Sequence, residues 1–207
     1  MKLFWKRFFD IVVSLLGILI TSPILLVVSV LIKLTSKGPV FYKQERIGKG
    51  EKPFFILKFR TMVVNADQQG LKITVGGDKR ITGVGKFLRK SKLDELPQLF
   101  NVFAGQMSLV GPRPEVAEYV SLYNDEQRKV LSVRPGITDY ASVCFRNENE
   151  ILAEAENPQK EYIEHIMPLK LRYNAKYIEE MSVWTDLKLI FLTLYVILGG
   201  EVKITLD

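Results

Sequence analysis

Two adjacent carboxylates, Asp94 and Glu95, lie in the part of the sequence best suited to chemistry. Pro97 follows them, and proline is tolerated in the first turn of a helix but not deeper inside one. We therefore expect a helix to start near Ser91–Asp94, with both carboxylates at the positive end of its dipole. Three cations lie just before them in the sequence: Arg89, Lys90 and Lys92.

This setting keeps a carboxylate ionised and also attracts phosphate oxygens. An ionised carboxylate that faces a bound phosphoryl group acts either as a metal ligand or as a nucleophile. The alternative is routine capping, because acidic residues often occupy the first turn of a helix. The same helix is expected to bury an apolar stripe made of Leu96, Leu99, Phe100 and Phe103.

Other cations are placed to bind an anion. Arg113 stands between Pro112 and Pro114, which stiffen the backbone, and a guanidinium can hold a phosphate through two parallel hydrogen bonds. Lys58 and Arg60 fall on one face of an expected strand, where two neighbouring cations need an anion. The alternatives are that Arg113 pairs with a nearby carboxylate and that the other two cations are solvated at a sheet edge.

The composition limits the catalytic chemistry. The single histidine, His165, excludes a two-histidine metal site, and the single cysteine, Cys144, excludes an intramolecular disulfide and suits a reducing cytoplasm. Any catalyst must therefore consist mainly of carboxylates, arginine and lysine. The net charge of +6 favours anionic partners: nucleic acid, phosphorylated ligands or a lipid surface. We expect no nucleic acid, since the sequence carries no recognised motif for it and the cations cluster beside an apolar segment.

That apolar segment, Ile11 to Ile32, has 22 uncharged residues and is long enough, at about 33 Å as a helix, to cross a bilayer. Ser22-Pro23 lies at its centre, where proline removes a backbone hydrogen bond. Basic residues flank both ends, although the positive-inside rule requires an asymmetry. A re-entrant helix broken at Ser22-Pro23, in which the Thr21 and Ser22 hydroxyls bond freed carbonyls, satisfies these features. A single-pass anchor with a mild kink is the alternative.

The rest of the sequence predicts a mixed α/β fold in which helices dominate and the β element is small. Strands are expected at 40–42 and 53–60 around a Gly48-Lys-Gly50 turn, before a polar loop over 65–79. From Trp184 onward the last helix is too short to span and suits an interfacial position along a bilayer, with a buried core helix as the alternative. The segments with helical patterns are 83–103, 115–131, 148–156 and 158–198, with a turn at Arg134-Pro-Gly136 and Pro168 punctuating the last.

Taken together, these residues resemble the bacterial sugar transferase family, and within it the monotopic polyprenyl-phosphate phosphoglycosyl transferases in their small, minimal catalytic form. The similarity covers nearly the whole chain, and the order and spacing of its motifs make it highly specific. These motifs are Lys6-Arg-Phe-Phe-Asp10, Ser22-Pro23, Lys58-Phe-Arg-Thr-Met62, Arg89, Leu93-Asp-Glu-Leu-Pro-Gln-Leu99, Asn101-Val, Met107-Ser-Leu-Val-Gly-Pro-Arg-Pro114, Arg134-Pro-Gly-Ile-Thr138 and Asp186-Leu-Lys.

The resemblance implies transfer of a phosphosugar from a nucleoside diphosphate sugar, usually a UDP-sugar, to polyprenyl (undecaprenyl) phosphate, with Mg²⁺ and release of UMP. It implies that Asp94 is the nucleophile of an aspartyl-phosphosugar intermediate and that Glu95 assists, through the metal or as an acid/base. The implied substrate-binding residues are Lys58, Arg60, Arg89, Pro112, Arg113, Pro114, Arg134 and Arg146, and the implied metal ligands are Asp94, Glu95 and Asp186.

The implied organisation is a re-entrant membrane helix over 1–36, a catalytic domain over 37–200 and a tail over 201–207. The domain would face the cytoplasm from the inner membrane and serve the first membrane step of glycoconjugate or polysaccharide biosynthesis. Its partners would be the UDP-sugar, polyprenyl phosphate and the phospholipid membrane, while dimerisation through the membrane helix is left open. The alternative function is a membrane-anchored basic binding module without catalysis.

One segment departs from the family pattern. After Thr138 the family commonly continues Gly-Trp-Ala-Gln-Val-Asn-Gly-Arg, whereas this chain has Asp139-Tyr-Ala-Ser-Val-Cys-Phe-Arg146, followed by an acidic stretch over 148–156. We expect this segment to shape the sugar or acceptor pocket, so the identity of the sugar is not carried over from the family.

Overall fold

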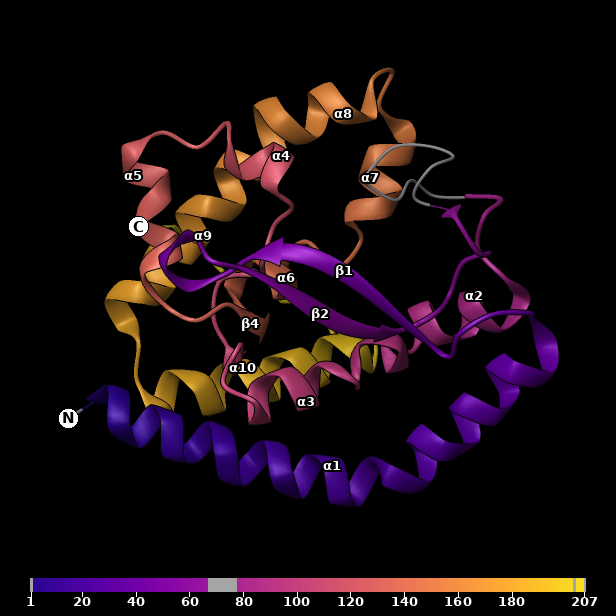
Figure 1. Ribbon diagram of the computed structural model, residues 1–207. Coiled ribbons are helices and arrows are strands. Elements are labelled where there is room, and N and C mark those ends of the chain that lie inside the picture. Colours follow the sequence, from indigo (N-terminus) through magenta and orange to yellow (C-terminus); the bar gives the residue numbers. More distant parts are fainter. Residues whose placement is uncertain (1, 67–77, 203, 207) are drawn as a thin grey trace.

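The computed structural model describes residues 2–66, 78–202 and 204–206 of the chain. Its first element, helix α1 (Lys2–Thr35), continues through Pro23 and bends (Figure 1), so the expected break is a bend within one helix. Pro23 cannot donate to the carbonyl of Leu19, and the Ser22 hydroxyl donates to that carbonyl at 2.8 Å, as predicted. The Thr21 hydroxyl instead bonds the carbonyl of Gly17, at 2.7 Å, which proline does not free.

The other helices and strands form two small sheets and a set of mostly short helices around them (Figure 1). A mixed, helix-dominant α/β fold is therefore confirmed. In chain order these elements are β1 (Phe41–Ile47), β2 (Pro53–Phe59), α2 (Gly83–Lys90), α3 (Gln98–Phe103), β3 (Ser108–Val110), α4 (Ala117–Val120), α5 (Asp125–Arg128), β4 (Gly136–Thr138), α6 (Tyr140–Cys144), α7 (Glu148–Glu154), α8 (Pro158–Glu161), α9 (Met167–Glu180) and α10 (Val183–Ile197).

Both halves of α1 pack against the rest of the protein. In the first half, the Lys6 ammonium donates to the carbonyl of Val110 at 3.0 Å, at the end of β3. One turn later, Asp10 accepts from the Ser108 hydroxyl and from the Leu109 N–H, each at 3.0 Å. In the second half, three α1 side chains share an apolar cluster with β2 and α2: Leu25, Val28 and Ile32, with Phe59 and Leu88. The bent helix is thus attached to the domain on both sides of Pro23.

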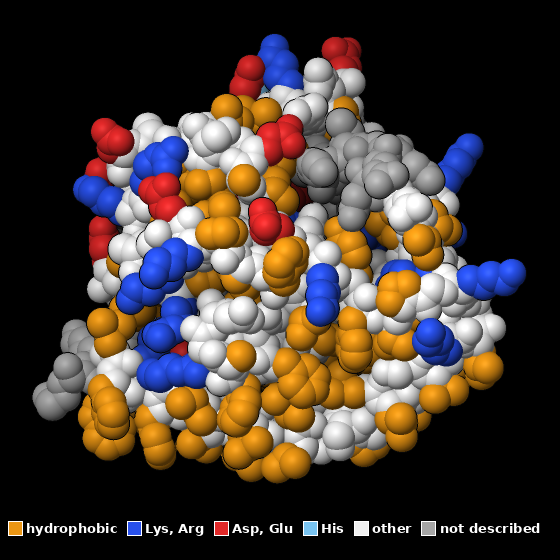
Figure 2. Space-filling view, in the orientation of Figure 1, with side chains coloured by type: hydrophobic (Ala, Val, Ile, Leu, Met, Phe, Trp, Pro, Cys, Tyr) orange, Lys and Arg blue, Asp and Glu red, His pale blue; other side chains and the backbone are white. Residues whose placement is uncertain are grey.

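The outward side of α1 is apolar. Over the described residues, Leu3–Thr35 is the one helix that is long and apolar enough to cross a membrane. Figure 2 shows hydrophobic side chains gathered along the side of the molecule that α1 forms. The α1 side chains that are more than half exposed, here called the apolar surface of α1, are Leu3, Phe4, Trp5, Phe8, Leu16, Leu19, Ile20, Leu26, Val27 and Leu34. Exposed apolar area of this size marks a contact with lipid or another apolar partner.

The β1–β2 hairpin agrees with the sequence prediction. The strands are antiparallel, with Phe41 opposite Phe59 and Ile47 opposite Pro53. A single 3-10 turn over Lys49–Glu51 connects them, and Gly50 adopts a φ of 66°, which glycine tolerates without steric cost. Most of the loop predicted over 65–79 lies outside the described residues. The second sheet, a parallel pair in which Ser108 faces Gly136 and Val110 faces Thr138, was not predicted.

The predicted helix over 83–103 is three separate pieces. Helix α2 ends at Lys90, a 3-10 turn covers Leu93–Glu95, and α3 starts after Pro97. The predicted buried stripe is wrong at Phe100 and Phe103, which are exposed. Instead α3 buries Gln98, Asn101 and Val102. This face of α3 is buried because Asn101 bonds to β2: its side-chain amide accepts from the Leu57 N–H at 2.9 Å and donates to the Phe55 carbonyl at 2.7 Å.

The predicted long helix over 158–198 changes its winding once and is interrupted once. A π-helical turn over Tyr162–Ile166 joins α8 to α9 without a gap, and the helix breaks before α10, where the Ser182 hydroxyl accepts from the Thr185 N–H at 3.1 Å. Helix α10 buries one side and exposes the other, with Trp184 81% and Phe191 68% exposed and Leu189 fully buried. It therefore combines the two predicted characters, a core helix and a helix with an apolar outer surface.

Candidate active site

Asp94 occupies a short, tightly constrained turn. Two residues earlier, Lys92 adopts the left-handed conformation at φ 58° and reverses the chain between α2 and the 3-10 turn. This directs Asp94 inward, where it is 7% exposed, and its Oδ1 atom is buried without a hydrogen-bond partner among the described residues. Burial, and then the charge of Glu95, raise the pKa of the Asp94 carboxyl above its usual value, against the opposing effect of Lys58. Asp94 is thus a buried carboxylate with a free oxygen.

Glu95 has the opposite surroundings. The Arg113 guanidinium donates to both of its oxygens, at 2.5 and 3.1 Å, and the Lys58 ammonium donates to Oε1 at 3.1 Å. Burial opposes ionisation of Glu95, but Arg113 and Lys58 hold the pKa of its carboxyl well below the usual value. The alternative in which Arg113 pairs with a nearby carboxylate therefore describes this structure, and the carboxylate is a predicted site residue.

Arg113 is held by a rigid loop. Pro112 and Pro114 on either side of it are buried. The Gly111 N–H donates to the carbonyl of Thr138 at 3.0 Å, so the loop continues the pairing of β3 with β4. A Cβ at Gly111 would lie 2.6 Å from the carbonyl oxygen of Arg134, so this approach requires glycine. The short parallel sheet therefore positions Arg113 opposite the turn that carries Asp94 and Glu95.

Arg89 completes a group that we call the carboxylate–cation cluster. Its members are Asp94, Glu95, Lys58, Arg89 and Arg113. Burial lowers the pKa of the Lys58 ammonium, and Glu95 opposes that shift. Arg89 donates through Nε to the Thr61 hydroxyl at 2.9 Å. Burial lowers the pKa of its guanidinium, and the charge of Asp94 opposes that shift. Three buried or half-buried cations around two carboxylates leave one positive charge in excess, which suits an anionic ligand.

Three predicted substrate-binding arginines lie elsewhere. Arg60 donates to the carbonyls of Lys37 and Ser36, at 2.6 and 3.0 Å, in the main chain just after α1. Arg134 donates to the carbonyl of Gly105 at 2.9 Å. Arg146 approaches the carbonyl of Ile197 at 3.4 Å. Arg60 lies one residue beyond the end of β2, where the chain meets α1.

Asp186, a predicted metal ligand, lies away from Asp94 and Glu95 in this structure. It is fully buried, its Oδ2 accepts from the Lys6 ammonium at 2.5 Å, and its Oδ1 accepts from the Tyr177 hydroxyl at 2.7 Å. Both oxygens are thus engaged in a cluster that joins α1, α9 and α10. Within the described part of the chain, no group of three or more histidine, cysteine, aspartate or glutamate side chains is arranged to hold a metal ion. Asp94 and Glu95 are the members of the predicted set that stay together.

Sequence reasoning missed two residues that support the site. Thr61, which holds Arg89, directly follows the Lys58-Phe-Arg60 run, so the motif itself contained the signal. Asp139 is fully buried and accepts from the Arg113 N–H at 3.3 Å. It opens the segment that departs from the family pattern, and its link to Arg113 follows from the pairing of β3 with β4.

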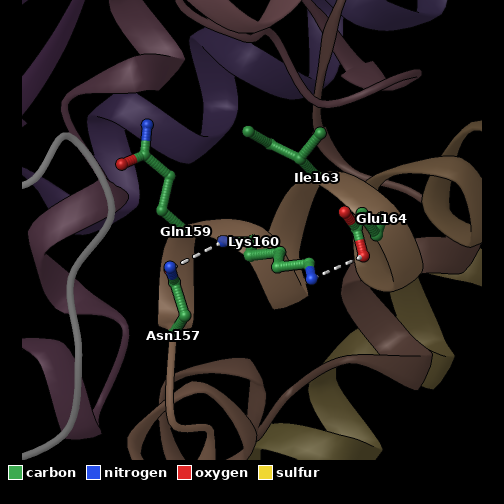
Figure 3. Close-up of a pocket in the computed structure, with 5 residues that line it drawn as sticks. All are labelled: Asn157, Gln159, Lys160, Ile163 and Glu164. Atoms are coloured by element: carbon green, nitrogen blue, oxygen red, sulfur yellow. Dashed lines mark hydrogen bonds and ion pairs between the residues drawn. The ribbon is translucent and has the colours of Figure 1, made fainter.

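A shallow surface pocket lies apart from this cluster, along α8 and the π-helical turn that follows it (Figure 3). Asn157 Oδ1 accepts from the main-chain N–H of Lys160 at 3.0 Å, and the Lys160 ammonium pairs with Glu164 at 3.9 Å. All of its lining residues come from one stretch, 157–164, and none is a predicted site residue.

The fold and the cluster define a domain with one long apolar helix and a buried site of carboxylates and cations, suited to phosphate chemistry near a membrane. The chain belongs to the bacterial sugar transferase family, whose pattern it matches over residues 1–200. It is 40% identical over 200 residues to a UDP-N-acetylgalactosamine-undecaprenyl-phosphate N-acetylgalactosaminephosphotransferase of Aeromonas hydrophila, covering 95% of this chain and 44% of that protein.

Two other relatives differ in length. A UDP-glucose:undecaprenyl-phosphate glucose-1-phosphate transferase of Klebsiella pneumoniae is 41% identical over 199 residues, covering 92% of this chain and 39% of that protein. The uncharacterized sugar transferase EpsL of Bacillus subtilis (strain 168) is 36% identical over 196 residues, covering 95% of this chain and 88% of that protein. The chain thus spans about two-fifths of the length of the first two relatives and most of the third.

Proposed function

We propose that this protein transfers a phosphosugar from a UDP-sugar to undecaprenyl phosphate and releases UMP. The observation that carries the proposal is the Oδ1 atom of Asp94, which is buried and has no hydrogen-bond partner among the described residues. Lys58 and Arg89 act on its charge, and Arg113 bonds the adjacent Glu95. A free carboxylate oxygen next to an excess of positive charge suits attack on a bound diphosphate. The names of the relatives support the choice of donor and acceptor, because they couple UDP-sugars to undecaprenyl phosphate.

The proposed reaction has two steps. An oxygen of Asp94 attacks the phosphorus that carries the sugar, a bond forms between them, and the bond from that phosphorus to the bridging oxygen breaks, so that UMP leaves. A phosphate oxygen of the polyprenyl acceptor then attacks the same phosphorus, and the carboxylate of Asp94 is regenerated. Arg113 and Lys58 stabilise negative charge on the diphosphate oxygens during both steps, once the ligand takes the place of Glu95 on their donors.

The residues present fit Mg²⁺ in a mode that uses few protein ligands. Mg²⁺ is commonly bound by one or two carboxylates together with substrate phosphates and water. The free oxygen of Asp94 provides one such ligand, and Glu95 provides another when its cations turn to the substrate. When bound, the ion would offset negative charge on the diphosphate and on the departing UMP.

We also propose that α1 enters one leaflet and returns to the same face, so that the protein is monotopic and faces the cytoplasm. Lys6 near one end of α1 bonds β3, and Ser36 after the other end bonds Arg60, so one domain holds both ends. A straight crossing would place those ends on opposite sides of the bilayer. The bend at Pro23 and the apolar surface of α1 support this arrangement.

The test is UMP release by detergent-purified protein with undecaprenyl phosphate, Mg²⁺ and a panel of UDP-sugars. We expect release with one or a few sugars, and loss of that release in Asp94→Asn with folding retained. Transient labelling of the wild-type protein by the radiolabelled sugar phosphate, absent in Asp94→Asn, would support the covalent step. Wild-type turnover by Asp94→Asn would refute Asp94 as the nucleophile, and binding of UDP-sugar without release would favour the non-catalytic binding module.

A further inference from the structure

Asp139 stands at a junction between the site and the rest of the domain. It connects β4 to α6, and it is a carboxylate with no exposed surface at all. A buried carboxylate is costly unless hydrogen bonds satisfy both of its oxygens. Here Oδ1 accepts from the Ser142 N–H at 2.6 Å, which caps α6, and Oδ2 accepts from the Arg113 N–H at 3.3 Å. One side chain thus links the start of a helix to the main chain of Arg113.

Asp139 accepts the one main-chain N–H that the segment Pro112-Arg113-Pro114 can donate. Pro112 and Pro114 have no N–H, so Arg113 carries the single amide donor of this tripeptide. The acceptors on either side are already bonded: Pro112 O accepts from the Gly136 N–H at 3.0 Å, and Pro114 O accepts from Arg46 at 3.1 Å. Asp139 therefore adds a third hydrogen bond to a loop whose Pro112 and Pro114 carbonyls are already bonded.

The fixed loop matters because the Arg113 side chain must change partners. In this structure its guanidinium donates to both oxygens of Glu95, and Nη1 also donates to the carbonyl of Ile137 at 3.4 Å. To bind the diphosphate of a sugar nucleotide, the side chain must turn to the ligand. If the main chain were loose, each such turn would also cost the entropy of ordering the loop.

We propose that Asp139 is a positioning residue for the donor substrate: it anchors the main chain of Arg113 so that only the side chain moves between Glu95 and the sugar nucleotide. The proposal rests on the proposed function for the identity of the ligand. It assigns a role to the first residue of the segment where this chain departs from its family, and it predicts an effect on donor binding rather than on the chemical steps.

The first experiment measures the hydrogen bond between the Arg113 N–H and Asp139 directly, without an activity assay. Hydrogen–deuterium exchange is followed in a peptide that begins at Gly111, where Arg113 supplies the first exchangeable main-chain amide because its neighbours are prolines. Asp139→Asn keeps an oxygen for Ser142 but replaces the acceptor of Arg113, and Asp139→Ser keeps the cap but is too short to reach Arg113. We expect Arg113 to exchange about tenfold faster in both variants. Exchange at the unprotected rate in the wild-type protein, or unchanged rates in both variants, would overturn the anchor.

The second experiment measures KM for the UDP-sugar against kcat in the same variants. Asp139→Asn should raise KM about tenfold while kcat changes less than about threefold. The matched control is Asn157→Ala, which removes a comparable cap from α8, where Asn157 accepts from the Lys160 N–H, and should lower only the melting temperature. Unchanged KM, or a fall in kcat and melting temperature alone, would overturn the positioning role. Absence of turnover in the wild-type protein would count against the proposed function, while the exchange rates would still decide the anchor.

Discussion

At the scale of single residues, the most informative contrast is between Asp94 and Glu95. They are neighbours in sequence and both are largely buried, yet their pKa values shift in opposite directions. Glu95 is fully bonded to Arg113 and Lys58, whereas Asp94 keeps a free oxygen. In the proposed function this asymmetry separates their roles: Asp94 would be the group that reacts, and Glu95 would neutralise the cations until the substrate arrives.

Asp94→Asn is expected to stabilise the protein while it abolishes turnover. Burial raises the pKa of Asp94 on folding, so the folded state binds the proton more tightly than the unfolded chain. The ionised carboxylate therefore costs stability above its usual pKa, and a neutral amide of the same shape removes that cost, on the order of 1 kcal/mol.

The measurement is thermal unfolding in detergent. Asp94→Asn should melt a few degrees above the wild-type protein at pH 7.5, and this difference should shrink towards pH 4, where Asp94 itself takes up a proton. Asp125→Asn, on the exposed face of α5, is the control and should change little. A lower melting temperature for Asp94→Asn at pH 7.5 would contradict the reasoning.

Glu95→Gln should bind UDP more tightly while it turns over less. Removing this carboxylate leaves Arg113 and Lys58 without their anion, and it also removes a negative charge that a diphosphate must displace. We expect affinity for UDP in metal-free buffer to rise by about tenfold. Calorimetric titration measures this, with Glu118→Gln as a control of equal charge change. Weaker binding of UDP by Glu95→Gln would show that Glu95 does not compete with the ligand.

The carboxylate–cation cluster was predictable from sequence to the extent that its chemistry is local. Asp94, Glu95 and Arg89 lie within one short stretch, and the prolines on both sides of Arg113 indicate a cation on a rigid backbone. The positions of Asp186 and Arg60 could not be predicted, because their partners are far away in the chain: Asp186 pairs with Lys6, 180 positions earlier. No local pattern reveals such a pairing.

At the scale of elements, helix boundaries limited the sequence prediction. The apolar pattern over 83–103 continues across Lys92, whose left-handed backbone ends α2, and lysine gives no signal for that conformation. The hairpin and α1 were predictable because turn glycines and an uncharged run of 22 residues are strong local signals. The pairing of β3 with β4 involves strands of three residues each, too short for any periodicity to appear.

The buried pair Lys6–Asp186 offers a test of how α1 is attached. Asp186→Asn leaves a buried ammonium without its counter-ion and should destabilise the protein by about 3–5 kcal/mol. The double variant Lys6→Met/Asp186→Asn should recover much of that loss, because it removes both charges. Unfolding of the three proteins in denaturant measures the coupling, with Glu126→Gln in the exposed Lys129–Glu126 pair as a control without measurable effect. Equal losses in the single and double variants would contradict a coupled pair.

At the scale of the whole molecule, the arrangement of α1 predicts a topology. Single cysteines at positions 2 and 37, in a Cys144→Ser background, should both resist a membrane-impermeant thiol reagent added outside intact cells. Both should react after the membrane is made permeable, which shows that they are accessible from the cytoplasm. Labelling of one position alone from outside would mean that α1 crosses the bilayer.

The double attachment of α1 has a consequence for hydrophobic mismatch. A free membrane helix answers a thicker or thinner bilayer by changing its tilt. Here Lys6 and the residues after Thr35 are held by one domain, so α1 cannot tilt without turning the whole protein. In the proposed one-leaflet arrangement α1 also never meets the far leaflet. Turnover should therefore stay nearly constant in vesicles of lipids with shorter or longer acyl chains, a property that a spanning anchor would not share.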